Sequence, residues 1–211
     1  MKKLEWYFDF ISPFSYLATD QFHRLPAHVA ITCIPVLFAG LLEYWKQKGP
    51  AELLTKRRFT NRYVQWLAVR HGVPFKAPPA HPFNPLRVLR LSIALDNDLE
   101  IIREIFHFIW REGRRPDAPE DWQALKQQLN VPDADERIAA PAVKDALRNN
   151  GECALAAGVF GVPTFIVDGE LFWGFDGFEF LIDYLNDPEL LNREEMRRVT
   201  DLPIGVERRR R

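Results

Sequence analysis

Hydrophobic and polar positions along the chain predict a β-α-β unit at its start. Residues 4–10 form a short run dense in aromatic side chains, which suits a half-buried or buried strand. Apolar residues then recur at helical spacing over residues 13–25, and Pro26 ends the predicted helix. Residues 29–36 are rich in β-branched side chains and predict a second strand. Units of this kind usually form a parallel strand pair with a right-handed crossover.

The middle of the chain, from residue 39 to about residue 150, carries a helical pattern without strand signals. One stretch, residues 73–82, contains four prolines and predicts an extended loop. Gly72 just before it is a suitable helix stop, and Asn84-Pro85 just after it is a cap-then-proline helix start. The predicted helices cover residues 41–45, 51–71, 86–95, 99–110, 119–129 and 135–148.

Strand signals return after this block. A short Ala-rich helix is predicted over residues 152–160, and two apolar runs then flank Asp168-Gly169, a strong hairpin signal. Residues 178–185 predict a last helix. The order β-α-β, helical insert, α-β-β-α is that of an α/β thioredoxin fold with a large all-helical insertion. We expect residues 1–38 and 151–187 to form the thioredoxin-like domain, 39–150 the insertion subdomain, and 188–211 a charged tail.

Composition narrows the class of protein. A chain of 211 residues with 47% hydrophobic residues can bury one full core, or a core with an inserted subdomain. The net charge of −1 argues against nucleic acid as the main partner. No apolar run approaches the roughly 20 residues that span a bilayer, and Met1-Lys2-Lys3 leads directly into a strand. We therefore expect a cytoplasmic protein without membrane contact, whose last residues, Arg208 to Arg211, form a solvated end or, as the alternative, a polyanion-binding one.

Cysteine and histidine spacing argues against two kinds of site. Cys33 and Cys153 form no CxxC pair or metal-ligand spacing, and both are expected to be buried as small hydrophobic residues, with a disulfide or a reactive thiol as the alternative. The histidines show no metal-ligand pattern, so no metal site is predicted.

Ser12 stands between the first strand and Pro13, where it is predicted to cap a helix. The free N–H groups and the dipole of a helix start also favour a thiolate or carboxylate that arrives there. A plain helix cap is the alternative. In a thioredoxin fold the redox cysteines stand at this place, but here both positions, Ser12 and Ser15, are serine. The pair cannot form a disulfide, so thiol-disulfide exchange is excluded.

Three motifs together resemble the 2-hydroxychromene-2-carboxylate isomerases, relatives of the kappa-class glutathione transferases in the DsbA-like thioredoxin superfamily. The first is F-D-F-x-S-P-F-S-Y-L at residues 8–17, and the second is H-P-F-N-P-L-x-x-L-R-L at residues 81–91. The third is G-V-F-G-V-P-T-F at residues 158–165, followed by D-G-x-x-F-W-G at 168–174. The resemblance covers roughly residues 4–186.

The resemblance implies a glutathione site. Ser12, with Pro13 and Phe14 beside it, matches the serine that faces the glutathione sulfur, where a hydroxyl donor and a helix start lower the thiol pKa. Val162-Pro163 matches the cis-proline segment that pairs with the cysteinyl backbone, against a trans turn proline as the alternative. Asp176, at the start of the last helix, matches the acid that holds the γ-glutamyl end, a role compatible with a simple cap.

Other positions depart from the family pattern or match it less closely. After Trp173-Gly174 the family has a polar residue and Asp-Arg, where this chain has Phe175, Asp176 and Gly177, so one amide and one guanidinium donor are missing. Gln47 falls near another glutathione contact. No basic residue clearly matches the one that meets the substrate carboxylate, and three are candidates to replace it, with solvated helix charges as the alternative: Lys46, Lys56 and Arg62.

These features predict a glutathione-dependent isomerase of an aromatic or unsaturated keto acid, and the resemblance implies a homodimer. The glutathione thiolate would add to a conjugated carbon, allow rotation and leave again. His81 and Asn84 are substrate-side candidates, with loop packing and helix capping as alternatives. Candidates for an apolar wall, which core packing would equally explain, are Phe14, Phe83, Trp173 and Phe175. Two other functions stay open: a kappa-like glutathione transferase or peroxidase, and a redox-silent thioredoxin-fold binding protein.

Overall fold

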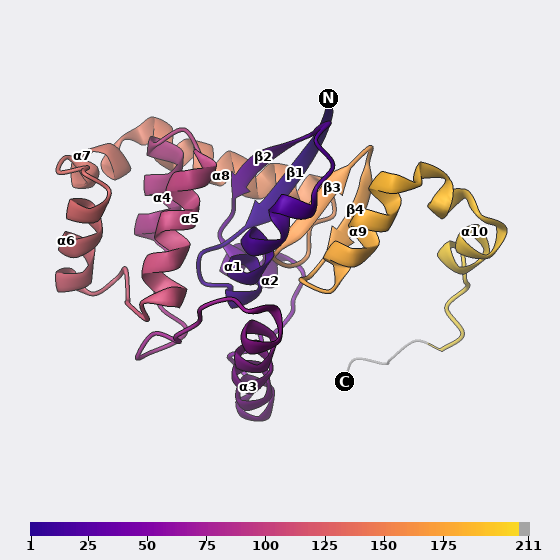
Figure 1. Ribbon diagram of the computed structural model, residues 1–211, viewed down its shortest axis with the longest axis horizontal. Coiled ribbons are helices and arrows are strands. Elements are labelled where there is room, and N and C mark those ends of the chain that lie inside the picture. Colours follow the sequence, from indigo (N-terminus) through magenta and orange to yellow (C-terminus); the bar gives the residue numbers. More distant parts are fainter. Residues whose placement is uncertain (207–211) are drawn as a thin grey trace.

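A computed structural model describes residues 1–206 of the chain and has the predicted α/β architecture, built on one mixed sheet (Figure 1). The strand order is β2-β1-β3-β4. The two N-terminal strands run parallel, with Leu4 opposite Ile31, and the other neighbouring pairs are antiparallel. The strands are β1 (Lys2–Phe8), β2 (Val29–Pro35), β3 (Thr164–Val167) and β4 (Glu170–Trp173).

Two helices of the thioredoxin pattern border the sheet. Helix α1 (Pro13–Asp20) continues into the 3-10 turn η1 (Gln21–Arg24), and α9 (Gly177–Asn186) follows the β3–β4 hairpin. The hairpin turns at Asp168-Gly169, where both residues have positive φ, 54° and 84°. That backbone matches the twist of the flanking strands and explains the Asp-Gly sequence.

The helices of the middle block lie between β2 and β3 along the chain, and most of them gather on one side of the sheet (Figure 1). Helix α3 projects from the body and ends at Gly72, which has φ 69° as a left-handed cap. The block comprises α2 (Phe38–Tyr44), α3 (Leu54–His71), α4 (Leu86–Ala94), α5 (Leu99–Phe106), the π-helical turn η2 (His107–Arg111), α6 (Pro119–Gln128), α7 (Ala134–Ala139) and α8 (Pro141–Ala156).

One helix boundary was predicted wrongly. The separate helices expected over residues 135–148 and 152–160 are instead α7 and the long α8, which break at Ala140. Pro141 causes the break, because a proline has no N–H to donate and is well accommodated as a first helical residue. Gly151 lies inside α8 without ending it.

An aromatic cluster joins the sheet to the helical block. Trp6 stacks on Phe8 at 4.2 Å between ring centroids, and Phe10 contacts Phe106 of α5 at 4.7 Å. These rings are fully buried and belong to one core that continues through α4, α6 and α8. The strand β1 and the segment after it are therefore fixed on both sides, which holds the start of α1 in place.

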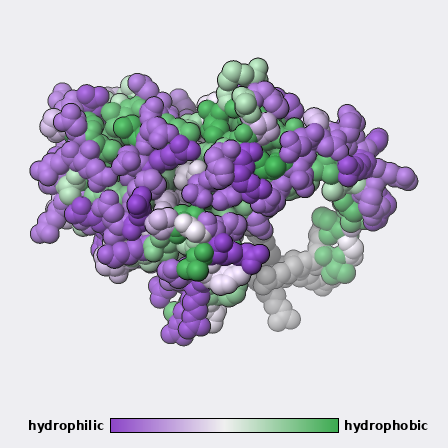
Figure 2. All heavy atoms as spheres, viewed as in Figure 1, coloured by the Kyte–Doolittle hydropathy of each residue, from purple (hydrophilic) through white to green (hydrophobic). Residues whose placement is uncertain are grey.

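The C-terminal segment extends away from the rest of the molecule (Figures 1 and 2). It contains two short helices that were not predicted, η3 (Pro188–Asn192) and α10 (Glu194–Thr200), and neither buries a residue. Arg208 to Arg211 lie outside the described residues. Across residues 1–206 we find no helix that combines the length and the apolar character needed to cross a bilayer.

The two cysteines differ in environment. Cys33 is buried in β2, and burial raises the pKa of its thiol to about 12. The expectation that Cys153 is also buried was wrong, since it is exposed on α8. A thiol held protonated by its surroundings is a poor nucleophile, so Cys33 is a packing residue.

Candidate functional site

The turn after β1 displays Ser12 at the N-terminus of α1. The Ser12 N–H donates to the Asp9 carbonyl at 3.0 Å, and the Ser12 Oγ accepts from the Ser15 N–H at 3.2 Å. This confirms the predicted helix cap. The same hydroxyl points across to the Val162 carbonyl, to which it donates at 3.4 Å. That contact is long, so the hydroxyl proton is weakly held and available to a better acceptor.

Asp9 fixes this turn from beneath. Its side chain is completely buried, and its two carboxyl oxygens accept from the N–H groups of Ile11 and Phe38, at 3.0 and 2.9 Å. Burial raises the pKa of Asp9 to about 7, and the two backbone hydrogen bonds oppose that rise. The carboxyl ties the start of α2 to the Ser12 turn.

Two side chains of the helical block also hold the turn through its carbonyls. The indole N–H of Trp110 donates to the Phe10 carbonyl, and the Nε2 of His81 lies 2.9 Å from the Ile11 carbonyl. A carbonyl only accepts, so Nε2 carries the hydrogen and Nδ1 of the neutral ring is left as an acceptor. Burial lowers the pKa of His81, which favours this neutral form.

The segment before β3 forms the opposite side of the site. The Val162-Pro163 peptide bond is cis, as the resemblance implied, and the Pro163 carbonyl accepts from the Gly174 N–H at 2.9 Å. Trp173 covers this segment, because its Nε1 lies only 2.4 Å from where a Cβ on Gly161 would stand. The lack of a side chain at Gly161 is therefore what allows the half-exposed indole to lie here.

Replacing Gly161 by alanine is expected to displace Trp173 and to lower the free energy of unfolding by about 1 to 3 kcal/mol, as overpacking does. Urea unfolding followed by tryptophan fluorescence measures both effects. Gly151→Ala in α8 is the matched control, because a Cβ there meets nothing within 4 Å. It should stabilise the helix slightly. Equal stability of the two variants would contradict the close packing of Trp173.

A cavity of about 350 Å³ lies beside this site, between α3 and the start of α9. Arg70 and Asp176 both line it, and within residues 1–206 neither side chain forms an ion pair. Asp176 begins α9 without a capping hydrogen bond and turns its Oδ1 back over Gly174. The geometry therefore does not favour the alternative in which the Asp176 side chain simply caps α9. The other lining residues are Gln21, Tyr63, Trp66, Leu67, His71, Phe175, Phe178 and Glu179.

The site residues expected from the sequence fall into separate places. The residues around the start of α1 are Ser12, His81, Val162, Pro163 and Trp173. Phe175 and Asp176 instead line the cavity, which Ser12 does not reach. Phe14 connects the two, since its ring lies 6.2 Å from that of Tyr63.

The remaining candidate residues either lie away from Ser12 or already have hydrogen-bond or packing partners within the protein. Asn84 accepts from the Leu86 N–H and donates its own N–H to Asp117, and Phe83 is buried in the core. Gln47 is exposed just beyond α2, whose end is held to the Val159 carbonyl by the Trp45 indole at 2.9 Å. Exposed positions are also occupied by Lys46, Lys56 and Arg62, and Gly177 is the first residue of α9.

Sequence reasoning missed two groups of residues. For Asp9 a signal was present in the sequence, because it is a single carboxylate between aromatic residues at the end of the first strand. No local signal pointed to Arg70 and His71, which lie at the end of an ordinary basic helix and reach the site because the end of α3 faces Phe175 and the start of α9.

Comparison with known proteins now defines the class. Residues 3–186 match the model of the DsbA-like thioredoxin domain, and the chain belongs to this family.

Within this family, the chain is similar to isomerases and to kappa-class glutathione transferases. The chain is 28% identical over 194 residues to a 2-hydroxychromene-2-carboxylate isomerase of Sphingobium xenophagum, which covers 88% of this chain and 99% of that protein. It is 27% identical over 209 residues to a glutathione S-transferase kappa 2 of Caenorhabditis elegans, with 89% and 93% covered. The resemblance found from the motifs is thereby confirmed.

Solved structures show the same fold. A 2-hydroxychromene-2-carboxylate isomerase superposes with a TM-score of 0.77 at 22% identity, covering 90% of this chain and 97% of that one. The cytosolic disulfide reductase DsbM of Pseudomonas aeruginosa, solved with GSH, gives 0.59 at 14% identity, with 94% and 97% covered.

Proposed function

We propose that the protein is a glutathione-dependent isomerase of an aromatic or unsaturated keto acid such as 2-hydroxychromene-2-carboxylate. The observation that carries the proposal is the Ser12 hydroxyl, which stands at a helix start with only a long hydrogen bond to Val162 and with no thiol beside it. The sulfur must then come from a ligand, and relatives named as isomerases and kappa-class transferases support glutathione as that ligand.

The residues present match two parts of glutathione, its central cysteinyl group and its γ-glutamyl end. Bound there, glutathione would supply a thiolate that adds to a conjugated carbon of the substrate and leaves after rotation. Ser12 would donate its hydroxyl hydrogen to the sulfur, and the first N–H groups of α1 would favour the negative charge. The backbone of Val162 would pair with the cysteinyl part.

The cavity beside α9 would accommodate the γ-glutamyl end. An α-amino-acid head carries one ammonium and one carboxylate group. Asp176 and Arg70 offer the complementary charges, and both line this cavity. Arg70 would thus replace the guanidinium that is missing at Gly177. The Trp66 ring under the Arg70 guanidinium, at 5.3 Å, holds it beside the cavity.

Replacing Arg70 by glutamine is expected to weaken glutathione binding about 10-fold, because a charge-assisted hydrogen bond to a carboxylate is lost. Calorimetric titration with S-methylglutathione measures the affinity without involving the thiol. Arg58→Gln, on the exposed side of the same helix, is the control and should bind normally. Equal weakening by both changes would indicate a general charge effect.

In this proposal His81 would be the residue that meets the substrate. Its neutral Nδ1 can accept a hydrogen bond from a phenolic or enolic hydroxyl, while Nε2 stays on Ile11. Phe14 and Trp173 would cover the flat face of an aromatic substrate.

The experiment that tests the function compares two reactions. Glutathione-dependent interconversion of 2-hydroxychromene-2-carboxylate without net consumption of glutathione supports the isomerase. Conjugation of a chloronitrobenzene instead supports a kappa-like transferase. If calorimetry detects neither glutathione binding nor competition by S-alkylglutathione, both enzymes are excluded and the redox-silent binding protein is the better proposal. The homodimer is part of the same proposal, and light scattering measures it.

A further inference from the structure

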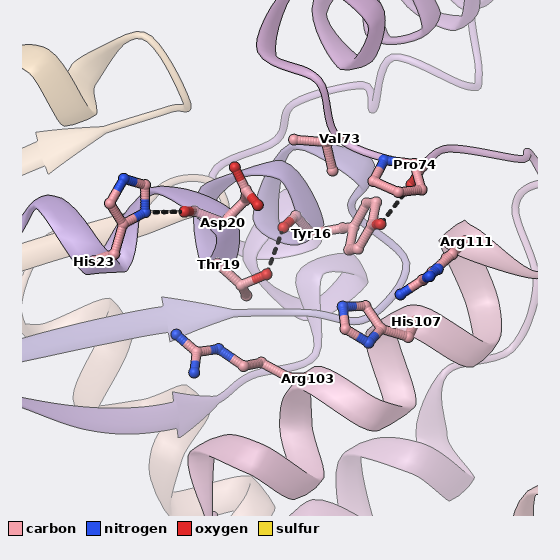
Figure 3. A pocket seen from close by; sticks show the side chains of 9 residues that line it. All are labelled: Tyr16, Thr19, Asp20, His23, Val73, Pro74, Arg103, His107 and Arg111. Carbon is pink, nitrogen blue, oxygen red and sulfur yellow. Dashed lines mark hydrogen bonds between the residues drawn. The ribbon is translucent and has the colours of Figure 1, made fainter.

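A second cavity, of about 320 Å³, opens at the other end of α1 (Figure 3). It lies between α1–η1 and the ridge formed by α5 and η2, and Val73 and Pro74 border it. Ser12 caps the N-terminus of α1, whereas Asp20 at this cavity ends the helix, about 12 Å further along its axis. The cavity is therefore separate from the site proposed for glutathione.

One wall of this cavity carries basic side chains from a single ridge. Arg103, His107 and Arg111 are spaced four residues apart and face α1 (Figure 3). The ridge changes to a π-helical turn here, in which the His107 carbonyl accepts from the Glu112 N–H at 3.0 Å. Such turns are rare and occur often at functional sites.

The basic wall has unused hydrogen-bond donors. Arg103 is paired with Glu100 at 2.6 Å, but within residues 1–206 Arg111 has no carboxylate partner and the His107 ring has no hydrogen bond. Burial lowers the pKa of His107, the carboxylates of Glu104 and Glu100 oppose that change, and the charges of Arg111 and Arg103 add to it, so the neutral ring with one N–H donor is favoured.

The opposite wall is polar and largely occupied by internal bonds. The Tyr16 hydroxyl donates to the Pro74 carbonyl at 2.5 Å, and the Thr19 hydroxyl donates to the Tyr16 carbonyl at 2.7 Å. Among residues 1–206, only Gln21 Nε2 donates to the Asp20 carboxylate, to Oδ2 at 3.2 Å, and Oδ1 accepts no hydrogen bond. This wall therefore offers acceptors, whereas the ridge offers donors.

We propose that this cavity binds a small oxyanion that also carries a hydroxyl group, either a hydrogen phosphate or a hydroxy acid. Arg111 and Arg103 hold the anionic oxygens, and His107 donates a further hydrogen bond. Asp20 accepts from the ligand hydroxyl across the cavity. An anion without a hydroxyl would leave Asp20 facing it unpaired, which disfavours it.

Titration of the full chain with inorganic phosphate and, separately, with malate tests the proposal at constant ionic strength, which keeps charge screening equal. The ring resonances of His107 are followed by NMR, with those of exposed His28 as the internal reference. We expect a saturable shift of the His107 signals, with or without a shift of those of His23 on the opposite wall but with none of those of His28, and a dissociation constant on the order of 1 mM. Saturation by phosphate identifies the phosphate source, and saturation by malate identifies the carboxylate source.

Arg111→Gln should weaken this binding about 10-fold, whereas Arg148→Gln, at an exposed arginine paired with Asp145, should not change it. An unchanged melting temperature of both variants shows that they are folded. The proposal is overturned if neither probe gives a saturable shift, or if the Arg111 variant binds as the parent does. Glutathione is absent from the sample, so neither result depends on the proposed function.

Discussion

Ser12→Ala is expected to reduce glutathione-dependent turnover about 100-fold or more and to return the pKa of the bound thiol toward its value in free glutathione. The change removes a hydroxyl that would donate to the thiolate and whose own side chain is buried, where one such donor has a large effect. Ultraviolet absorbance of the thiolate, recorded against pH with glutathione saturating, measures the pKa directly. An unchanged turnover and thiol pKa would refute the role of Ser12.

Two further variants separate this effect from helix capping. Ser12→Gly also removes the hydroxyl, but glycine is tolerated as a cap, so its stability should fall by less than the roughly 1 kcal/mol expected for alanine. Both variants should lose activity equally. Ser15→Ala is the matched control, because the Ser15 Oγ is buried without a partner and its loss should leave turnover unchanged.

Asp9 is expected to make the protein less stable as the pH rises. The pKa of its carboxyl is about 7 in the folded chain and near 3.8 in the unfolded chain, so between these values the folded state binds more protons. The contribution of Asp9 is therefore most favourable below about pH 4 and is lost as the pH rises through about 7. Three pKa units correspond to roughly 4 kcal/mol, as an order of magnitude.

The measurement is the unfolding free energy by urea, at about pH 5 and about pH 8, for the parent and Asp9→Asn. His81 and His107 have lowered pKa values and act in the opposite direction, since they stabilise the fold as the pH rises. The difference between parent and variant cancels this background. That difference should shift by a few kcal/mol between the two pH values. An equal pH dependence in parent and Asp9→Asn would disprove the prediction.

Most of the fold could be predicted from local sequence patterns. The Asp168-Gly169 turn, the Ser12-Pro13 helix start and the Gly72 stop each depend on backbone chemistry that a few neighbouring residues determine, and all three are confirmed. The break at Pro141 was misplaced because an alanine-rich stretch has no periodicity strong enough to fix its limits. The C-terminal helices were missed for a related reason, since they are short and none of their residues is fully buried.

The candidate site was only partly predictable. Ser12, Val162 and Pro163 come from motifs with fixed local geometry, and the structure brings them together. Arg70 comes from a helix whose position depends on long-range packing, which no short segment encodes. The role of Asp9 likewise depends on the two backbone N–H groups that its carboxylate accepts from, one of them 29 residues away.

The aromatic core that runs from β1 into α5 has a consequence for folding. Because Phe10 and Phe106 share one buried cluster, the helical block has no separate core boundary along which it would open while the sheet stays intact. Heat or denaturant should then melt residues 1–186 in a single cooperative transition. Local opening would be confined to the outer turns of α3 and to the C-terminal segment, so that the turn carrying Ser12 exchanges its amide hydrogens only on global unfolding.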